Sequence, residues 1–414
     1  MNEEQIQQQI QEQIQEQIQE LDREPEPEPH SPSSPTKPPP SETEIKLINK
    51  GSYGCIYRPE ITCDGNIGNS MYVSKIQENS SFIEKEKKLG SLIQEKIPHY
   101  LQYFSPIIKT CYVSLSPISE EEQAKCDVLK KETDTNSIAT TAATAATADA
   151  TATAATTTAD TTATPSDKDQ TYISSKIRYV GNKNIYDYLE SLPNDESIFV
   201  KKIQSTYLYL LQSLKKLKEI GIIHYDIKAD NILYDEKNHS PIIIDFGISF
   251  IGSSVNPENR QYVFYTKEFY PVWCIDIFLL SYIVQTKMNP TTQITAEDFS
   301  QLFEHFYTEL NKLIPILPEE HQSILKNFEN TFQPFIGKTW ESLYEYLYTP
   351  NIYETWDHYS LCVTFLMMLH EINKTSHFHF IKNAAIQQYI KLWKSVVYAM
   401  PNARVSLEEE FMKI

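Results

Sequence analysis

The residues His224-Tyr225-Asp226-Ile227-Lys228-Ala229-Asp230-Asn231-Ile232-Leu233 are followed by the shorter motif Ile244-Asp245-Phe246-Gly247. Asp226, Lys228 and Asn231 lie on one short loop between apolar runs, and Asp245 follows 19 residues after Asp226, about the span of a hairpin. A carboxylate can orient a hydroxyl, a lysine can neutralise a moving phosphate, and an Asn with a second Asp can hold magnesium. The pattern predicts phosphoryl transfer, with Asp226 and Lys228 as catalytic residues and Asn231 and Asp245 as Mg²⁺ ligands.

This combination, His-x-Asp-x-Lys-x-x-Asn followed by Asp-Phe-Gly, resembles the eukaryotic-type Ser/Thr protein kinase family. Its details are most similar to the divergent kinases of large DNA viruses, and the resemblance runs from about Glu44 to the C-terminus with two insertions. It implies an α+β, two-lobed protein kinase-like fold, with an antiparallel β-sheet N-lobe and a mainly helical C-lobe. It also implies transfer of the ATP γ-phosphate to a protein, and the lysine at 228 favours Ser or Thr as the acceptor.

A glycine-rich stretch near the start of this region resembles the loop that covers the nucleotide in kinases. Its residues, which we expect to bind ATP, are Asn49, Lys50, Gly51, Ser52, Tyr53, Gly54, Cys55 and Ile56. Glycines allow backbone N–H groups to approach phosphates closely. Asn49 replaces the usual first glycine, and because Asn tolerates positive φ, the turn can survive the replacement. Taken alone, Gly-x-x-Gly would indicate an ordinary hairpin turn.

Lys75, 24 residues after Gly51, resembles the strand lysine that contacts the α- and β-phosphates of ATP. Its expected partner is a helix glutamate, for which Glu86 has suitable spacing to the residues that follow. The gap from Lys75 to Glu86 is only 11 residues, shorter than usual, so Glu84 stays open as the alternative. The alternative without a nucleotide is that Lys75 is a surface lysine of a strand and that both glutamates lie on a solvated helix face.

Two departures from the family pattern bear on regulation. Tyr225 stands where an Arg usually precedes the catalytic Asp, and that Arg pairs with a phosphate on the activation loop of many kinases. The Ala-Pro-Glu motif is missing, and Glu268 is a poor match for its glutamate. Arg404 resembles the late structural arginine whose usual partner is that glutamate, so the sequence leaves its partner unidentified.

The main C-lobe helix has its best match at Asp357-His358-Tyr359-Ser360, and Cys274-Ile275-Asp276 is an earlier, poorer match. If Asp357 is correct, a helical insertion occupies about residues 270–355, where peptide substrates usually dock. The protein substrate therefore cannot be identified from the sequence.

The expected organisation has three parts. Residues 1–43 are a Gln/Glu-rich and Pro-rich tail, which we interpret as disordered because one Ile per helical turn buries little surface; a coiled coil is the alternative. Residues 44–180 form the N-lobe, with a disordered Thr/Ala insert at about 132–170, and residues 181–414 form the C-lobe. Strands are predicted at 45–50, 54–58, 71–76, 104–115 and 172–180. Helices are predicted at 80–96, with Phe82 and Leu89 near its apolar face, and at 198–220.

Composition limits the other functions. The net charge of −18 over 414 residues argues against general nucleic-acid binding. No apolar run is long enough to span a bilayer, and the first residues lack the features of a secretory signal. The six cysteines show no zinc spacing, so we expect free thiols in a reducing compartment, the host cytoplasm or a virion if the protein is viral.

Alternatives from other classes stay open. A pseudokinase would use the fold as a nucleotide- or protein-binding scaffold, and the replaced glycine and missing Ala-Pro-Glu are consistent with it. A small-molecule phosphotransferase would share the His-x-Asp loop, but Lys228 and Asp-Phe-Gly argue against it. A structural role of the Gln/Ile tail could coexist with catalysis. The expected ligands are ATP and Mg²⁺, and the expected partner is a protein substrate.

Overall fold

The computed structural model describes residues 44–51, 54–78, 80–129, 172–286, 291–314, 318–375 and 382–411. The predicted tail at 1–43, the insert at 132–170, and Ser52 and Tyr53 lie outside the described residues. The described chain divides into two compact units. The sheet unit comprises residues 44–78, 109–129 and 172–177, and the helical unit comprises residues 80–108 and 178–411. The lobe boundary at residue 180 stays a prediction.

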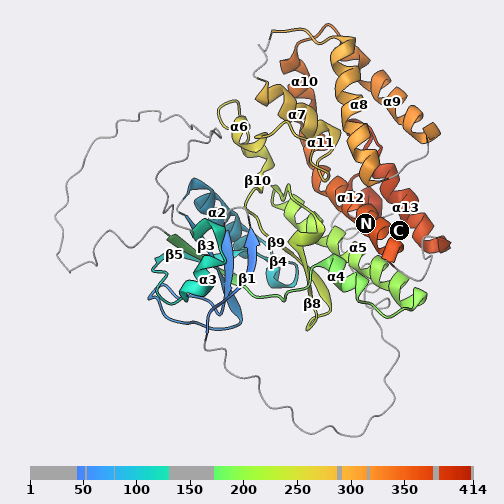
Figure 1. Cartoon of the computed structure of the whole chain (residues 1–414). Coiled ribbons are helices and arrows are strands. Elements are labelled where there is room, and N and C mark those ends of the chain that lie inside the picture. The colour runs from blue at the N-terminus through green and yellow to red at the C-terminus, as the bar shows by residue number, and fades with distance from the viewer. Residues whose placement is uncertain are drawn as a thin grey trace, which may run out of the picture. The chain divides into compact units, whose positions relative to one another are not determined.

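Five strands form the main sheet in the order β1-β2-β3-β6-β5 (Figure 1). Their bounds are β1 Lys46–Gly51, β2 Gly54–Arg58, β3 Tyr72–Glu78, β6 Tyr172–Arg178 and β5 Ile107–Val113. β1, β2 and β3 pair antiparallel. α3 (Glu120–Ala124) follows β5, and its Glu122 accepts a hydrogen bond from the backbone of Leu47 at 2.8 Å. An apolar core that includes Ile45, Tyr57, Ile76 and Val113 holds this unit together.

Two disulfides lie within the sheet unit and overturn the expectation of six free thiols. Cys55 in β2 bonds to Cys126, and Cys63 in the β2–β3 connection bonds to Cys111 in β5. The sequence separations of 71 and 48 residues leave no local Cys pattern from which either pair could be read. Cys274 and Cys362 are free and buried.

The helical unit contains two small sheets beside its helices. β4 (Phe104–Ser105), β9 (Ser240–Ile244) and β8 (Ile232–Asp235) form one, and β7 (Ile222–Ile223) pairs with β10 (Phe250–Ile251) in the other. β9 is the central strand of its sheet, and its Ile242-Ile243-Ile244 run suits a strand that is covered on both faces. These short strands position the loops that carry the predicted catalytic residues.

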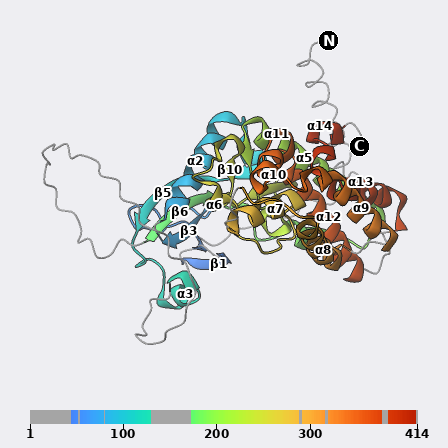
Figure 2. The same cartoon turned by 90° about the horizontal axis from the view of Figure 1, so that it is seen from above.

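Helices account for most of the rest of this unit (Figures 1 and 2). They are α2 Ser81–Lys96, α4 Ile185–Glu190, α5 Glu196–Glu219, α6 Arg260–Val263, α7 Ile275–Gln285, α8 Ala296–Leu313, α9 Pro318–Phe332, α10 Trp340–Leu347, α11 Pro350–Tyr353, α12 Trp356–Thr375, α13 Ala384–Val397 and α14 Leu407–Phe411. The 270–355 segment carries α7 to α11. α8 and α9 lie side by side, with tilted contacts between aromatic rings such as those of Phe303 and Phe328.

Local sequence explains where the longest helix begins and ends. Asp195 caps α5 by accepting hydrogen bonds from the backbone of Ser197 and Ile198. Gly221, one residue past the C-cap, has a φ of +73°, the left-handed conformation that glycine adopts most easily. Together these residues fix the point at which the chain enters β7 and the loop that follows.

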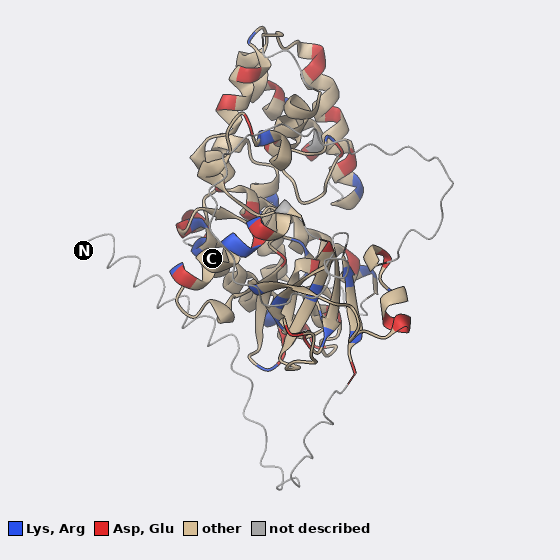
Figure 3. Ribbon diagram, turned by 90° about the vertical axis from the view of Figure 1, so that its left-hand side faces the viewer, with Lys and Arg blue, Asp and Glu red and all other residues tan. Residues whose placement is uncertain are grey.

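The α+β class with an antiparallel N-terminal sheet and a mostly helical C-terminal region is confirmed. The prediction that Phe82 lies near the apolar face of α2 was wrong. Phe82 is 52% exposed, whereas its neighbour Ile83 is fully buried. No helix among the described residues combines the length and apolar character needed to cross a membrane. Figure 3 shows Lys and Arg scattered among Asp and Glu over the described ribbon.

Candidate active site

Three predicted site residues meet on the loop that follows β7. The amide nitrogen of Asn231 donates to the backbone oxygen of Asp226 at 2.9 Å and to its Oδ2 at 2.8 Å. Nζ of Lys228 lies 2.9 Å from the same Oδ2. The loop therefore closes on itself around one carboxylate, and this orients the side chain of Asp226.

Tyr270 is a fourth member of this group, and the sequence did not single it out for this position. Its hydroxyl donates to Oδ1 of Asp226 at 2.6 Å and accepts from Nζ of Lys228 at 2.9 Å. Tyr270 follows Asp226 by 44 residues and lies in an irregular segment before α7, so no local periodicity marks it. Both oxygens of Asp226 are thus hydrogen-bonded.

The ionisation of the group follows from its packing. Burial lowers the pKa of Lys228, but the hydrogen bond with Tyr270 and the charge of Asp226 outweigh burial, so the pKa lies above its ordinary value. Burial first, and then the charge of Asp226 and the hydrogen bond to it, raise the pKa of Tyr270. At neutral pH the lysine is therefore a cation and the phenol keeps its proton.

Asp357, in the first turn of α12, anchors the backbone that precedes Asp226. Its two carboxylate oxygens accept the N–H groups of His224 at 2.7 Å and Tyr225 at 2.8 Å. Tyr225 has a φ of +72°, a costly conformation for a bulky residue, which persists where its surroundings hold it. Trp273 also holds this backbone, because its indole N–H donates to the backbone oxygen of Tyr225 at 2.8 Å.

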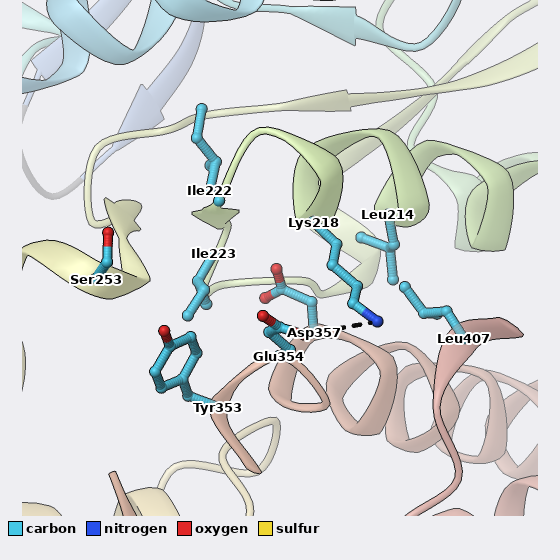
Figure 4. A pocket seen from close by; sticks show the side chains of 10 residues that line it. Leu214, Lys218, Ile222, Ile223, Ser253, Tyr353, Glu354, Asp357 and Leu407 are labelled. Atoms are coloured by element: carbon cyan, nitrogen blue, oxygen red, sulfur yellow. Dashed lines mark ion pairs between the residues drawn. The ribbon is translucent and has the colours of Figure 1, made fainter. Parts of the chain in front are cut away.

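Figure 4 shows this anchor from the side of a cavity of about 180 Å³. In this view Asp357 lies between Ile223 and Lys218 of α5. Nζ of Lys218 forms an ion pair with Oε2 of Glu354 at 3.6 Å. Burial raises the pKa of Asp357, while the charge of His224 and the two backbone hydrogen bonds oppose that rise. Of the two matches in the sequence, Asp357 is therefore the one whose carboxylate binds the backbone of the His224–Leu233 loop.

The side chain of Tyr225 is buried among aromatic rings instead of facing solvent. Its ring centroid lies 4.7 Å from that of Trp273 and 5.2 Å from that of Phe250. Its hydroxyl is buried with no hydrogen-bond partner among the described residues. A phosphate on a neighbouring loop could not reach this phenol.

Asp245 occupies a sharp turn at the end of β9. It is exposed, has a φ of +60°, and accepts the N–H of Gly247 at 3.3 Å. His224 connects this turn with the His224–Leu233 loop, because Nε2 lies 3.0 Å from the backbone oxygen of Ile244 and the ring centroid lies 4.9 Å from that of Phe246. The two motifs are thus tied together through one histidine.

The predicted nucleotide-loop residues are found in the sheet unit. β1 and β2 form a hairpin in which Gly51 pairs with Gly54. Asn49 lies in β1 opposite Ile56 and does not adopt positive φ, so the hairpin forms without drawing on the tolerance of Asn for that conformation. Gly54 is required by space, because an added Cβ would lie 2.7 Å from the backbone oxygen of Ile76.

Lys75 and Glu86 are both charged residues in buried positions. Lys75 lies in β3 at 8% exposure, opposite Ile56, and Glu86 lies in α2 at 4% exposure. The alternative, Glu84, is exposed, and its Oε1 lies 3.8 Å from Nζ of Lys87. Of the two candidate glutamates, Glu86 is therefore the buried one and Glu84 the exposed one.

Arg404 has a partner that the sequence did not identify. Its two terminal nitrogens donate to the two oxygens of Asp276, both at 2.9 Å, and neither side chain is exposed. Burial lowers the pKa of Arg404, but the charge of Asp276 opposes burial and outweighs it, so the pKa lies above its ordinary value. Asp276 therefore takes the place expected for the missing glutamate, and Glu268 is exposed.

The acidic residues of the described chain do not gather into a protein-only metal site. No group of three or more His, Cys, Asp or Glu side chains in the described ranges could hold a metal ion. Asn231 uses its amide nitrogen on Asp226, so its carbonyl oxygen is the atom left for a cation, and Asp245 offers an exposed carboxylate. Two such oxygen donors fit a cation that takes its other ligands from phosphate and water.

Comparison with known proteins agrees with this geometry. The family model described as "Protein kinase domain" matches residues 159–409, more than half of the chain. A probable serine/threonine-protein kinase, fnkB, of Dictyostelium discoideum is 33% identical over 97 residues, which is 23% of this chain and 17% of that protein. Serine/threonine-protein kinase C of Synechocystis is 42% identical over 61 residues, 14% of this chain and 11% of that protein.

A longer match is the negative regulator of sexual conjugation and meiosis of Schizosaccharomyces pombe, 22% identical over 205 residues, 50% of this chain and 31% of that protein. The chain thus spans less than a third of each of these relatives. The matched residues nevertheless include the His224–Leu233 loop, the Asp245 turn and the Asp276–Arg404 pair. The chain belongs to the protein kinase family.

Proposed function

We propose that the chain is a serine/threonine protein kinase that transfers the γ-phosphate of ATP to Ser or Thr of a protein. The observation that carries the proposal is the arrangement around Asp226, whose carboxylate is oriented by Asn231, Lys228 and Tyr270. Such a carboxylate is suited to receive the proton of an acceptor hydroxyl, and the lysine beside it is suited to neutralise charge on the transferred phosphoryl group.

In the proposed reaction, the acceptor oxygen forms a bond to the γ-phosphorus of ATP as the bond to the ADP oxygen breaks. The proton of the acceptor hydroxyl passes to Asp226, and Lys228 stabilises the equatorial oxygens. No covalent enzyme intermediate is needed, because catalysis consists of positioning and charge stabilisation. The Asp357 anchor keeps the loop backbone fixed while this occurs.

From the family resemblance, we propose that the β1–β2 hairpin, Lys75 and Glu86 take part in ATP binding. Asn231 and Asp245 would hold Mg²⁺, which would neutralise phosphate charge. Lys228 supports Ser or Thr as the acceptor through the family resemblance alone.

The rival is a pseudokinase, in which the fold binds a nucleotide or a protein without transferring phosphate. The intact set Lys75, Asp226, Asn231 and Asp245 favours the enzyme. The exposed carboxylate of Asp245 gives a variant that separates the two functions, because its removal should abolish metal-dependent transfer while leaving the fold unchanged.

The experiment is a radiolabelled-ATP assay of the purified chain and of Asp245→Ala, with casein, myelin basic protein and an aminoglycoside as acceptors. Labelling of a protein acceptor on Ser or Thr that the substitution abolishes supports the proposal. Labelling of the aminoglycoside alone would assign a small-molecule phosphotransferase. ATP binding without any transfer would assign the scaffold and contradict the proposal.

A further inference from the structure

The chain between β9 and α7 has a residue of the proposed site at each end. Asp245 lies at its start, and Tyr270, near its end, donates a hydrogen bond to Asp226 at 2.6 Å. Between these two residues the described chain is irregular except for β10, a 3-10 turn at Gly252–Ser254 and α6. Such a stretch has few backbone hydrogen bonds of its own, so its contacts with neighbouring helices decide where it lies.

Residues 252–264, which we call the anchored segment, meet α10 and α11 at their first residue. The hydroxyl of Tyr348, the C-cap of α10, donates to the backbone oxygen of Gly252 at 2.6 Å. An added Cβ at Gly252 would lie 2.6 Å from Cε2 of Tyr353 in α11, so the backbone passes directly against that helix. Gly252 is therefore required by close approach at this point.

An ion pair forms the second contact with α10. Nη1 of Arg260, the first residue of α6, donates to Oε1 of Glu341 at 2.8 Å. The guanidinium carbon also lies 4.6 Å from the ring centroid of Tyr344, which is three positions after Glu341 on α10. The two charged side chains are only 23% and 33% exposed, so solvent screens this pair less than a fully exposed one.

Phe264 forms the third contact and is fully buried. Its ring centroid lies 6.1 Å from that of Tyr344 and 5.9 Å from that of Tyr348. The same ring lies 6.2 Å from that of Trp356, the first residue of α12. Its backbone oxygen accepts a hydrogen bond from the side chain of Gln285, at the end of α7. α6 and α10 both pack on α7, and Figure 1 shows the three helices together.

Aromatic contacts continue from the anchored segment to the proposed site. The ring of Trp356 lies 6.0 Å from that of Tyr225, and the ring of Tyr265 lies 5.7 Å from that of Trp273. Trp273 in turn lies 5.1 Å from the ring of Tyr270, and its indole N–H binds the backbone of Tyr225. Because packed rings have little free space, a shift of the anchored segment would displace the rings beside Tyr225 and Tyr270.

We propose that Arg260 and Glu341 are positioning residues for phosphoryl transfer, through which α10 holds the anchored segment and thereby keeps Tyr270 against Asp226. This gives the 270–355 segment a task inside the active site. The inference rests on the proposed kinase function, because the constant that it affects is the kcat of that reaction. Arg260 and Glu341 act on Asp226 indirectly, through the position of Tyr270.

The test reverses each charge in the purified full chain, as Arg260→Glu and Glu341→Arg, and then combines the two. The double variant restores an ion pair of opposite polarity, so it separates loss of the pair from loss of either residue. Glu309→Arg is the matched control, because Glu309 forms an ion pair with Lys312 at 2.6 Å on α8, within the same 270–355 segment. Melting temperatures establish folding, and Glu341→Gln, which removes the charge without repulsion, replaces a reversal that does not fold.

Each single reversal should lower kcat roughly 10-fold, because misplacing a positioned group slows transfer, while the KM for ATP stays within about 2-fold of the parent. The double variant should recover most of the loss, and Glu309→Arg should match the parent. Hydrogen exchange over residues 252–264 should be faster in each single variant and slower again in the double variant. In a Tyr270→Phe background, Glu341→Arg should lower kcat by less than about 3-fold, because the bridge that it acts on is already missing.

Single reversals with the kcat and the exchange rates of the parent would overturn the inference. A double variant that is no faster than the product of the two single effects would show that Arg260 and Glu341 do not act as a pair. An equal loss in Glu309→Arg, or a full effect of Glu341→Arg in the Tyr270→Phe background, would also overturn it. These results require an active parent and leave the kinase intact. Failure of the parent to label any protein would overturn the proposed function, and the effect on kcat with it.

Discussion

The phenol of Tyr270 donates to Oδ1 of Asp226 at 2.6 Å and accepts from Lys228 at 2.9 Å. It therefore joins the proposed proton acceptor to the proposed phosphate-binding lysine through one hydroxyl. Because both partners are charged, this bridge is stronger than a bond between neutral groups.

Tyr270→Phe removes the bridge and keeps the ring. Loss of a hydrogen bond to a charged group costs about 1.5–3 kcal/mol, so kcat should fall roughly 10–100-fold while the KM for ATP changes little. Steady-state kinetics separate the two constants. Tyr262→Phe, at an exposed tyrosine, is the control and should match the parent. A Tyr270→Phe enzyme as fast as the parent would show that the bridge positions nothing.

Asp276→Asn leaves Arg404 as a buried cation with a weaker partner. Breaking a buried ion pair destabilises a protein by about 3–5 kcal/mol, so we expect a large loss in the free energy of unfolding measured with urea. Glu268→Gln should behave as the parent, because Glu268 is exposed. Equal effects of the two substitutions would contradict the pairing of Arg404 with Asp276.

The chain should be active without phosphorylation of its activation loop. A phosphate receptor needs an accessible cation, and position 225 carries a neutral tyrosine that is buried among Trp273, Phe250 and Trp356. The measurement is a short assay of phosphatase-treated protein, shown to be unmodified by mass spectrometry. Inactivity that is reversed only by phosphorylation between Ile248 and Tyr270 would refute this.

The two disulfides predict that denatured, unreduced protein contains two free thiols, since four of the six cysteines are paired. Peptide mapping without reductant should recover Cys55 linked to Cys126 and Cys63 linked to Cys111. Reduction should lower the melting temperature, because each bond is worth about 2–4 kcal/mol. Six free thiols in protein kept from reductants would contradict the pairing.

The sequence predicted those parts of the site that are encoded locally. Asp226, Lys228 and Asn231 lie within six positions of one another, so their meeting follows from one loop, and the Ile242–Ile244 run marks the strand that leads to Asp245. The sequence could not predict partners set by tertiary packing.

Tyr270 and Asp276 are examples of that limit, because their partners lie 44 and 128 residues away. Asn49 illustrates a different limit of the sequence analysis. The prediction considered only the tolerance of Asn for positive φ, whereas strand pairing with Ile56 decides the conformation of Asn49. On α2, periodicity placed Phe82 near the apolar face, but Ile83 is the residue that packing buries.

Asp226→Asn tests the proposed phosphoryl transfer most directly. The amide keeps the size of the side chain and its contact with Lys228, but it cannot accept the proton of the acceptor hydroxyl. We predict that transfer of labelled phosphate to protein falls by at least about 100-fold, in line with the contribution of general-base catalysis, while the affinity for ATP measured by calorimetry is unchanged. Turnover within a few-fold of the parent would contradict the role of Asp226.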